Sequence, residues 1–259
     1  EVINREKLSP LQWLVFVLGF LVFFCDGLDT GIIGFIAPAL LGAWEITKQQ
    51  LAPVLSAALI GMSIGAILSG PLSDKFGRKG VIVITCCLFS IFTILCGFAS
   101  SITELSIYRF ITGLGLGAAM PNISTIVSEY MPAKRKAFLT GLAGCGFMLG
   151  ISCGGVMSAY MLESLGWAKV IIIGGIIPLL LVVVLVLKMP ESIPYLINNG
   201  KTKQAQGILE KIQGAPFAEG TEVVLPKSEA QGNESPVSLV LGKYLFGSSM
   251  MWLCCFMSL

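Results

Sequence analysis

The chain has 259 residues, of which 55% are hydrophobic and 12% charged, and its mean hydropathy is +0.85. Soluble domains carry about twice this charged fraction, so the composition excludes an ordinary soluble domain and indicates a protein that lies in a bilayer. The formal net charge of +2 gives no reason to expect a nucleic-acid partner. The chain has no histidine, and its eight cysteines lie in apolar stretches without metal-ligand spacing, so we expect no metal site and no enzyme.

Long apolar runs predict helices that cross the bilayer. Each run has about 20 residues or more, the length that a transmembrane helix needs, and charged or Pro/Gly-rich breaks separate the runs. The sequence therefore predicts an all-α membrane protein whose first spans lie near residues 11–41, 51–72, 80–99, 102–128, 137–161 and 167–189.

A polar segment and a further apolar run follow these six predicted spans. The segment is rich in Gly, Glu and Lys, which is typical of a linker, and 201–213 within it is expected to form a short amphipathic helix along the membrane. The apolar run begins near Leu245 and is cut off at Leu259. We expect a six-span bundle over 1–189, a cytoplasmic linker over 190–236 and, over 237–259, the start of a second bundle whose missing part is needed for function.

Basic residues mark one side of the predicted bundle. The loops on the side of the N-terminus hold most of the lysines and arginines, whereas the opposite loops hold only Lys48 and Lys169. Because cytoplasmic loops carry the excess of Lys and Arg, we expect the N-terminus in the cytoplasm. The expected location is the cell membrane, as a multi-pass protein of a bacterial inner membrane.

Two carboxylates interrupt the first predicted span. Asp26 and Asp29 are one helical turn apart and share a face, and each costs about 2.5–3.5 kcal/mol at the centre of a membrane helix. The functional interpretation is a proton carrier that borders a wet passage for a polar solute. The alternative is a buried ion pair that only holds spans together.

The fourth predicted span supplies a cation. If the bundle consists of two inverted three-helix repeats, this span is equivalent to the first, and Arg109 belongs to the same central site as the two aspartates. Its guanidinium is suited to hold a carboxylate substrate by two hydrogen bonds, or to pair with Asp26 or Asp29 when no substrate is bound. A structural salt bridge without substrate contact is the alternative.

The same span contains a glycine-rich run that ends in a proline. No strand precedes the run, so dinucleotide binding is not indicated. Inside an apolar helix the glycines allow close helix packing and the proline allows a kink. The residues expected in these roles are Gly113, Gly115, Gly117 and Pro121.

The loop after the second span, from Gly70 to Lys79, reads Gly-x-Leu-x-Asp-x-x-Gly-Arg-Lys, and the glycine run of the fourth span extends from Arg109 to Pro121. Both stretches resemble motifs of the Major Facilitator Superfamily. The stretches 129–135 and 190–192 resemble its other loop markers. The resemblance implies the family's fold and a cytoplasmic charge network that gates transport, with Asp74, Arg78 and Glu129 at its centre. The gating residues expected from it are Gly70, Asp74, Gly77, Arg78, Lys79, Glu129 and Arg135.

The first span resembles that of the aromatic acid:proton symporters, from Asp26-Gly-Leu-Asp29 to Pro38. This implies uptake of a small aromatic carboxylate, such as benzoate or 4-hydroxybenzoate, with protons by alternating access. Asp26 and Asp29 would serve coupling, Arg109 would be needed for transport, and no cofactor would be required. Candidates for contact with the substrate ring are Phe23, Phe24, Phe35, Tyr108 and Phe147.

Other functions remain open at this point. The stretch from Gly146 to Gly155 is close to a proton-antiporter motif but has Ile151 where that motif has proline. A sugar, a dicarboxylate or an exported drug is therefore an alternative solute. A non-transporting membrane sensor is a further alternative, and a channel is disfavoured because Arg109 opposes the two carboxylates.

Overall fold

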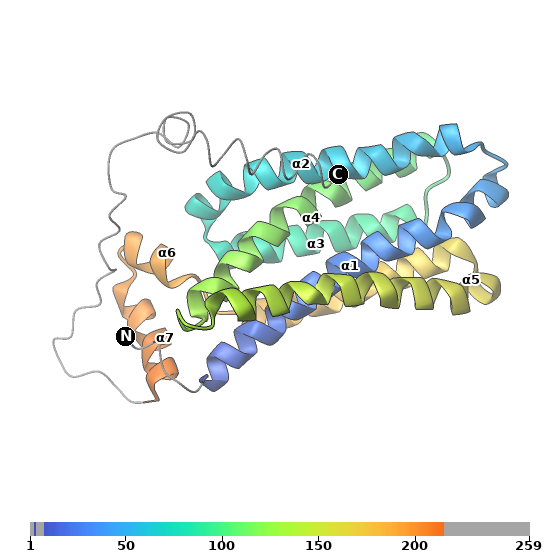
Figure 1. Ribbon diagram of the computed structural model, residues 1–259. Coiled ribbons are helices and arrows are strands. Elements are labelled where there is room, and N and C mark those ends of the chain that lie inside the picture. Colours follow the sequence, from blue (N-terminus) through green and yellow to red (C-terminus); the bar gives the residue numbers. More distant parts are fainter. Residues whose placement is uncertain (1–2, 4–7, 215–259) are drawn as a thin grey trace, which may run out of the picture. The chain divides into compact units, whose positions relative to one another are not determined.

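The computed structural model describes residue 3 and residues 8–214 (Figure 1). Within this part the chain is all α-helical, as predicted, and five helices are long and apolar enough to cross a membrane. The predicted seventh span and the linker beyond 214 lie outside the described residues. The helices are α1 (Pro10–Trp44), α2 (Lys48–Phe76), α3 (Arg78–Cys96), α4 (Ile102–Tyr130), α5 (Lys136–Lys188), α6 (Ile193–Asn198) and α7 (Thr202–Gln213).

Local sequence explains where several helices begin. Ser9 and Thr47 each accept a hydrogen bond from the backbone of the glutamine three residues later, and that glutamine's side chain accepts one from the backbone of the capping residue. These are capping boxes, which satisfy the free N–H groups at a helix N-terminus. The helices α1 and α2 thus start next to the predicted spans.

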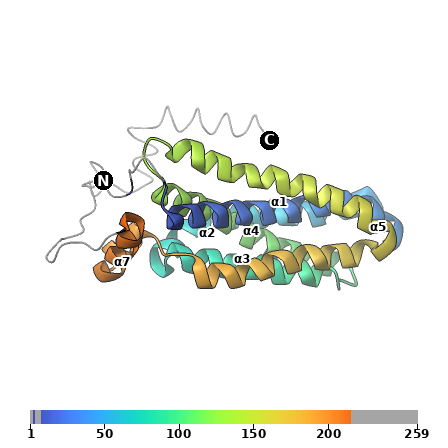
Figure 2. The same ribbon diagram turned by 90° about the horizontal axis from the view of Figure 1, so that it is seen from below.

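The predicted fifth and sixth spans form one assigned helix, α5, with a sharp reversal inside it. Gly166 has φ 77° and ψ 162°, a conformation that only glycine adopts easily. The two parts of α5 therefore run back antiparallel, as Figure 2 shows. α5 supplies two crossings, and the turn lies between the predicted ranges 137–161 and 167–189.

Glycines set the closest helix contacts of the bundle. A Cβ atom at Gly27 or Gly31 of α1 would meet the backbone of Phe147 or Ile151 in the first part of α5. The second part of α5 also reaches α1, because Gly174 lies against Ile32. α1 is thus held on two sides by α5.

The glycines of α4 pack closely against two neighbouring helices, α2 and α3. A Cβ at Gly113 or Gly117 would meet the backbone of α2, at Ala58 or Met62, and a Cβ at Gly115 would meet α3. Residues two apart on a helix point to different sides, whereas residues four apart share one. Pro121 lies inside α4, which continues across it.

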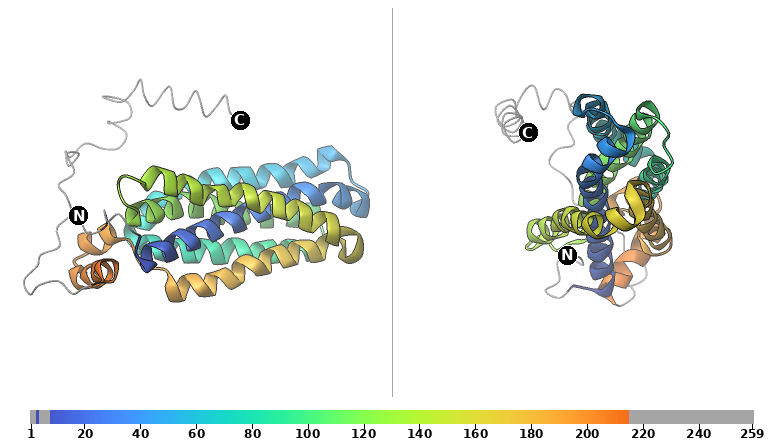
Figure 3. Two further views of the ribbon diagram at one scale, coloured as in Figure 1. Left: turned by 60° about the horizontal axis from the view of Figure 1, so that its bottom comes forward. Right: turned by 90° about the vertical axis from the view of Figure 1, so that its right-hand side faces the viewer.

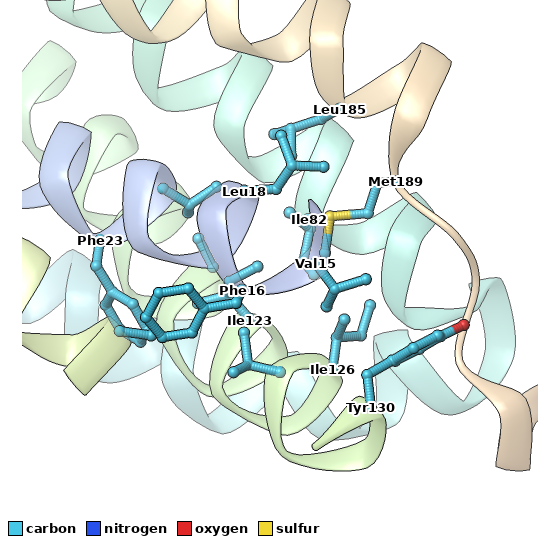
Figure 4. Packing of buried hydrophobic residues seen from close by; sticks show 14 of the residues in the cluster. Val15, Phe16, Leu18, Phe23, Ile82, Ile123, Ile126, Tyr130, Leu185 and Met189 are labelled. Atoms are coloured by element: carbon cyan, nitrogen blue, oxygen red, sulfur yellow. The ribbon is translucent and has the colours of Figure 1, made fainter. Parts of the chain in front are cut away.

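α6 and α7 lie at one end of the long helices, as all views show (Figure 3), and we call this end the α6 end. α7 occupies the segment predicted as an amphipathic helix. Its apolar residues Ala205, Leu209 and Ile212 are buried, and they join the hydrophobic cluster at this end. Figure 4 shows the cluster between α1, α3, α4 and α5, with Phe16, Ile123 and Tyr130 among its members.

Candidate functional site

A layer of polar side chains separates two hydrophobic clusters of the bundle. Along α1, the cluster at the α6 end includes Cys25 and the other cluster begins at Leu28, so Asp26 and Asp29 lie at their junction. On α3 and on α4, too, the residues on one side of Thr93 and Arg109 belong to the cluster at the α6 end, and those on the other side belong to the second cluster. The sequence-predicted charges of α1 and α4 therefore lie in one layer, within the interior of the bundle.

Arg109 and Asp29 form a buried ion pair. The distance from Arg109 Nη1 to Asp29 Oδ2 is 2.9 Å, and the two residues are 2% and 3% exposed. The hydroxyl of Thr93, on α3, donates a hydrogen bond to the other carboxylate oxygen, Asp29 Oδ1, at 2.8 Å. Asp29 thus links three helices, and both of its oxygens are occupied.

Asp26 is in a different position, although it is only one turn away. It is 1% exposed, and neither of its oxygens accepts a hydrogen bond from any residue that the structure describes. The thiols of Cys25 and Cys86 lie near it, and the carboxylate of Asp29 is the nearby charge. Asp26 is therefore a buried acid without a donor in this part of the chain.

Arg109 also keeps unused hydrogen-bonding capacity. Within the described residues its Nε and Nη2 groups donate to no oxygen or nitrogen atom, and the thiol of Cys96 is the side chain that interacts with the guanidinium besides Asp29. Nε and Nη2 together form one edge of the guanidinium plane, the geometry that binds a carboxylate by two parallel hydrogen bonds. The site consequently has a free acid and a free cationic edge next to a complete ion pair.

The three charged residues are deeply buried, each 3% exposed or less. That they border a wet passage in the whole protein stays a prediction. Burial is tolerable for Asp29 and Arg109 because each neutralises the other, whereas an unpaired ion at this depth is costly.

The predicted ring-contact residues are dispersed. Phe23 packs in the hydrophobic cluster beside Phe16 (Figure 4). The hydroxyl of Tyr108 donates to Glu104 Oε1 at 2.7 Å. Phe35 is 55% exposed, and its ring lies against Gly155.

Phe24 and Phe147 are only partly buried. Their backbones form the close contacts between α1 and α5, because a Cβ at Gly150 would meet the carbonyl of Phe24 and a Cβ at Gly27 that of Phe147. Of the five aromatic candidates, Phe35 is thus the most exposed side chain.

The predicted gating residues gather at the α6 end. Arg78 Nη1 lies 3.2 Å from Glu129 Oε1, so these two form an ion pair as the motif suggests. Asp74 is exposed and forms no ion pair with the residues described here, and Arg135 is exposed beside the start of α5. The loop at Gly77 has φ +84°, which explains the glycine there.

Glu191 is a central contact at this end, although the sequence indicated no role for it beyond the loop marker at 190–192. Its Oε1 accepts hydrogen bonds from the backbone N–H groups of Lys79 and Ser192, both at 2.9 Å, and its carbonyl accepts one from the hydroxyl of Tyr130 at 2.6 Å. α3 has no side-chain cap of its own, so Glu191 caps its N-terminus from a distant part of the chain. Only the Pro-Glu-Ser pattern signalled this residue.

A cavity of about 330 Å³ adjoins the same loop. Its lining is polar and comes from the end of α2, the start of α3 and from α6: Ser73, Asp74, Arg78, Pro194, Tyr195, Asn198 and Asn199.

A bundle of apolar helices with buried charges at mid-depth is the architecture of a multi-pass membrane protein. The chain belongs to the Major Facilitator Superfamily, which it matches over residues 19–259. Members of this family are transporters and not enzymes.

Similar proteins include transporters of aromatic acids. The 4-hydroxybenzoate transporter PcaK of Pseudomonas putida is 44% identical over 259 residues, which are 99% of this chain and 58% of that protein. The gallate transporter of the same species is 36% identical over 99% of this chain and 57% of its own length. The chain therefore spans somewhat more than half the length of these relatives.

Solved transporters share the fold. The proton:xylose symporter XylE, bound to 6-bromo-6-deoxy-D-glucose, is 25% identical, with a TM-score of 0.71 over 80% of this chain and 50% of XylE. The prediction of a major facilitator fold in this half is thereby confirmed.

Proposed function

We propose that this chain is one half of a transporter that imports small aromatic carboxylates together with protons. The observation that carries the proposal is Arg109, a cation buried at membrane depth whose Nε–Nη2 edge has no partner in the described part of the chain. A buried cation with a free bidentate edge suits an organic anion and gives no advantage to a neutral sugar.

The relatives support the aromatic class. Proteins that are 34–44% identical to the chain are named for transport of 4-hydroxybenzoate, gallate and benzoate, and one that is 39% identical is named for niacin. Each of these molecules is an aromatic ring with one carboxyl group. In the proposal the carboxylate approaches the free edge of Arg109, and exposed Phe35 is the candidate for ring contact from this half.

The different contacts of Asp26 and Asp29 support different roles for the two aspartates. Protonation of Asp29 would disrupt its ion pair with Arg109 and its hydrogen bond from Thr93. Protonation of Asp26 breaks no hydrogen bond that the described residues make. We assign proton carriage to Asp26, and we assign to Asp29 the task of holding Arg109 in place.

Alternating access completes the proposal. The Lys/Arg bias of the loops supports a cytoplasmic α6 end in a bacterial inner membrane, and the length of the relatives supports a second half that closes the cavity. The Arg78–Glu129 pair would open and close as the halves move. A partly exposed pair is suited to this because it contributes only about 0–1 kcal/mol.

The direct test is uptake by cells that express the gene of this protein. Labelled 4-hydroxybenzoate, gallate, benzoate and niacin are compared with xylose and succinate, in mildly acidic medium and with or without a protonophore. We expect protonophore-sensitive accumulation of at least one aromatic monocarboxylate and no accumulation of xylose or succinate. Accumulation of xylose or succinate alone would overturn the substrate class, and accumulation insensitive to the protonophore would overturn proton coupling.

A further inference from the structure

We propose that Thr93 is a positioning residue for transport, because its hydroxyl fixes the carboxylate that holds Arg109. The inference rests on the proposed function and adds a residue on α3 to a site otherwise built from α1 and α4. Thr93 does not contact the substrate in this proposal but acts through Asp29.

The hydroxyl of Thr93 behaves differently from the other hydroxyls inside α3. Thr85 and Ser90 donate to carbonyls one turn earlier on their own helix, at Val81 and Cys86. This is the usual choice for Ser and Thr in helices. Thr93 is 1% exposed and instead donates across to Asp29 Oδ1, 64 residues away in sequence.

The geometry explains what this hydrogen bond does. With Oδ1 held by Thr93, the other oxygen, Oδ2, is directed to Arg109 Nη1 at 2.9 Å. The carboxylate of Asp29 then holds Arg109 through Nη1, and the Nε–Nη2 edge donates to no oxygen of the described residues. Without the Thr93 hydroxyl, the carboxylate could rotate about its terminal torsion, which is a broad one, and occupy the edge that the substrate needs.

The test measures exchange of labelled 4-hydroxybenzoate in vesicles that contain the full-length protein, with equal pH on both sides. Thr93→Val keeps the shape and removes the donor, and we expect the KM for exchange to rise about tenfold with little change in the maximal rate. Thr93→Ser restores the donor and should restore the wild-type KM. Thr85→Val is the matched control, since it removes a hydroxyl on the same helix that donates only to its own backbone.

The outcomes separate this inference from the proposed function. If the wild type exchanges none of the aromatic acids, the proposed function fails. If the wild type exchanges 4-hydroxybenzoate and Thr93→Val has the same KM, the role of Thr93 is overturned. Equal increases in KM for Thr93→Val and Thr85→Val would also overturn it, and Thr93→Ala replaces Thr93→Val if the latter does not accumulate in the membrane.

Discussion

Asp29 forms an ion pair with Arg109 and accepts a hydrogen bond from Thr93. Asp26, one turn away, accepts no hydrogen bond from the part of the chain described. The two residues are almost equally buried. The two aspartates therefore differ in their partners and not in their burial, and we expect substitutions at the two positions to have different effects on stability.

Removal of the two carboxylate charges should affect stability unequally. Asp29→Asn leaves Arg109 buried without its counter-charge, and we expect a loss of about 3–5 kcal/mol in the free energy of unfolding. Asp26→Asn removes a charge that has no cationic partner within the described residues and should cost much less. Unfolding of the purified protein in detergent measures both, and the double variant Asp29→Asn with Arg109→Gln should recover part of the loss. Equal losses for the two single variants would contradict the assignment.

At residue scale the sequence indicated which charges matter but not how they pair. A carboxylate or arginine within an apolar run stands out by its cost, so Asp26, Asp29 and Arg109 were found directly. Thr93 was missed because an apolar helix tolerates threonine, and its hydroxyl usually bonds to its own backbone. Pairing across three helices depends on rotation and depth, which one sequence does not contain.

At the scale of helices, close packing depends on glycines that face a neighbour's backbone. The contacts between α2 and α4 are reciprocal, since Gly113 and Gly117 lie against α2 while Gly61 and Gly65 lie against α4. Such contacts let two backbones approach closely, and van der Waals packing then holds the helices together in lipid.

A single methyl group should test this interface. Gly117→Ala places a Cβ against the backbone of Met62, which cannot turn aside as a side chain can, and we expect destabilisation of about 1–3 kcal/mol. Gly144→Ala is the matched control, because a Cβ there meets nothing within 4 Å; its higher helix propensity should be neutral or stabilising by up to about 1 kcal/mol. The measurement is the unfolding midpoint of each variant, and equal midpoints would argue against the packing role.

The helices themselves were largely predictable, because the length of an apolar run follows from the thickness of the bilayer. The ends of α1 to α4 differ from the predicted spans by a few residues: α1, α2 and α4 continue past the apolar core, whereas α3 ends at Cys96, before the predicted end at 99. The contact of Glu191 with the start of α3 was not predictable, because it joins segments more than a hundred residues apart. Sequence pattern alone pointed to the Arg78–Glu129 pair, by resemblance to a family motif.

At the scale of the whole molecule, we propose that this chain is one bundle of a two-bundle transporter. The free acid and the free cationic edge lie in the described half, and the second half would supply the remaining wall of the cavity. Transport is therefore measured on the full-length protein and not on this bundle alone.

The central claim is that Asp26 carries the proton while Asp29 and Arg109 hold the substrate site. Vesicles with the full-length protein should accumulate labelled 4-hydroxybenzoate when an inward proton gradient is imposed, and should exchange it when no gradient is present. We predict that Asp26→Asn keeps exchange near the wild-type rate but loses gradient-driven accumulation. Accumulation by Asp26→Asn equal to that of the wild type would contradict it.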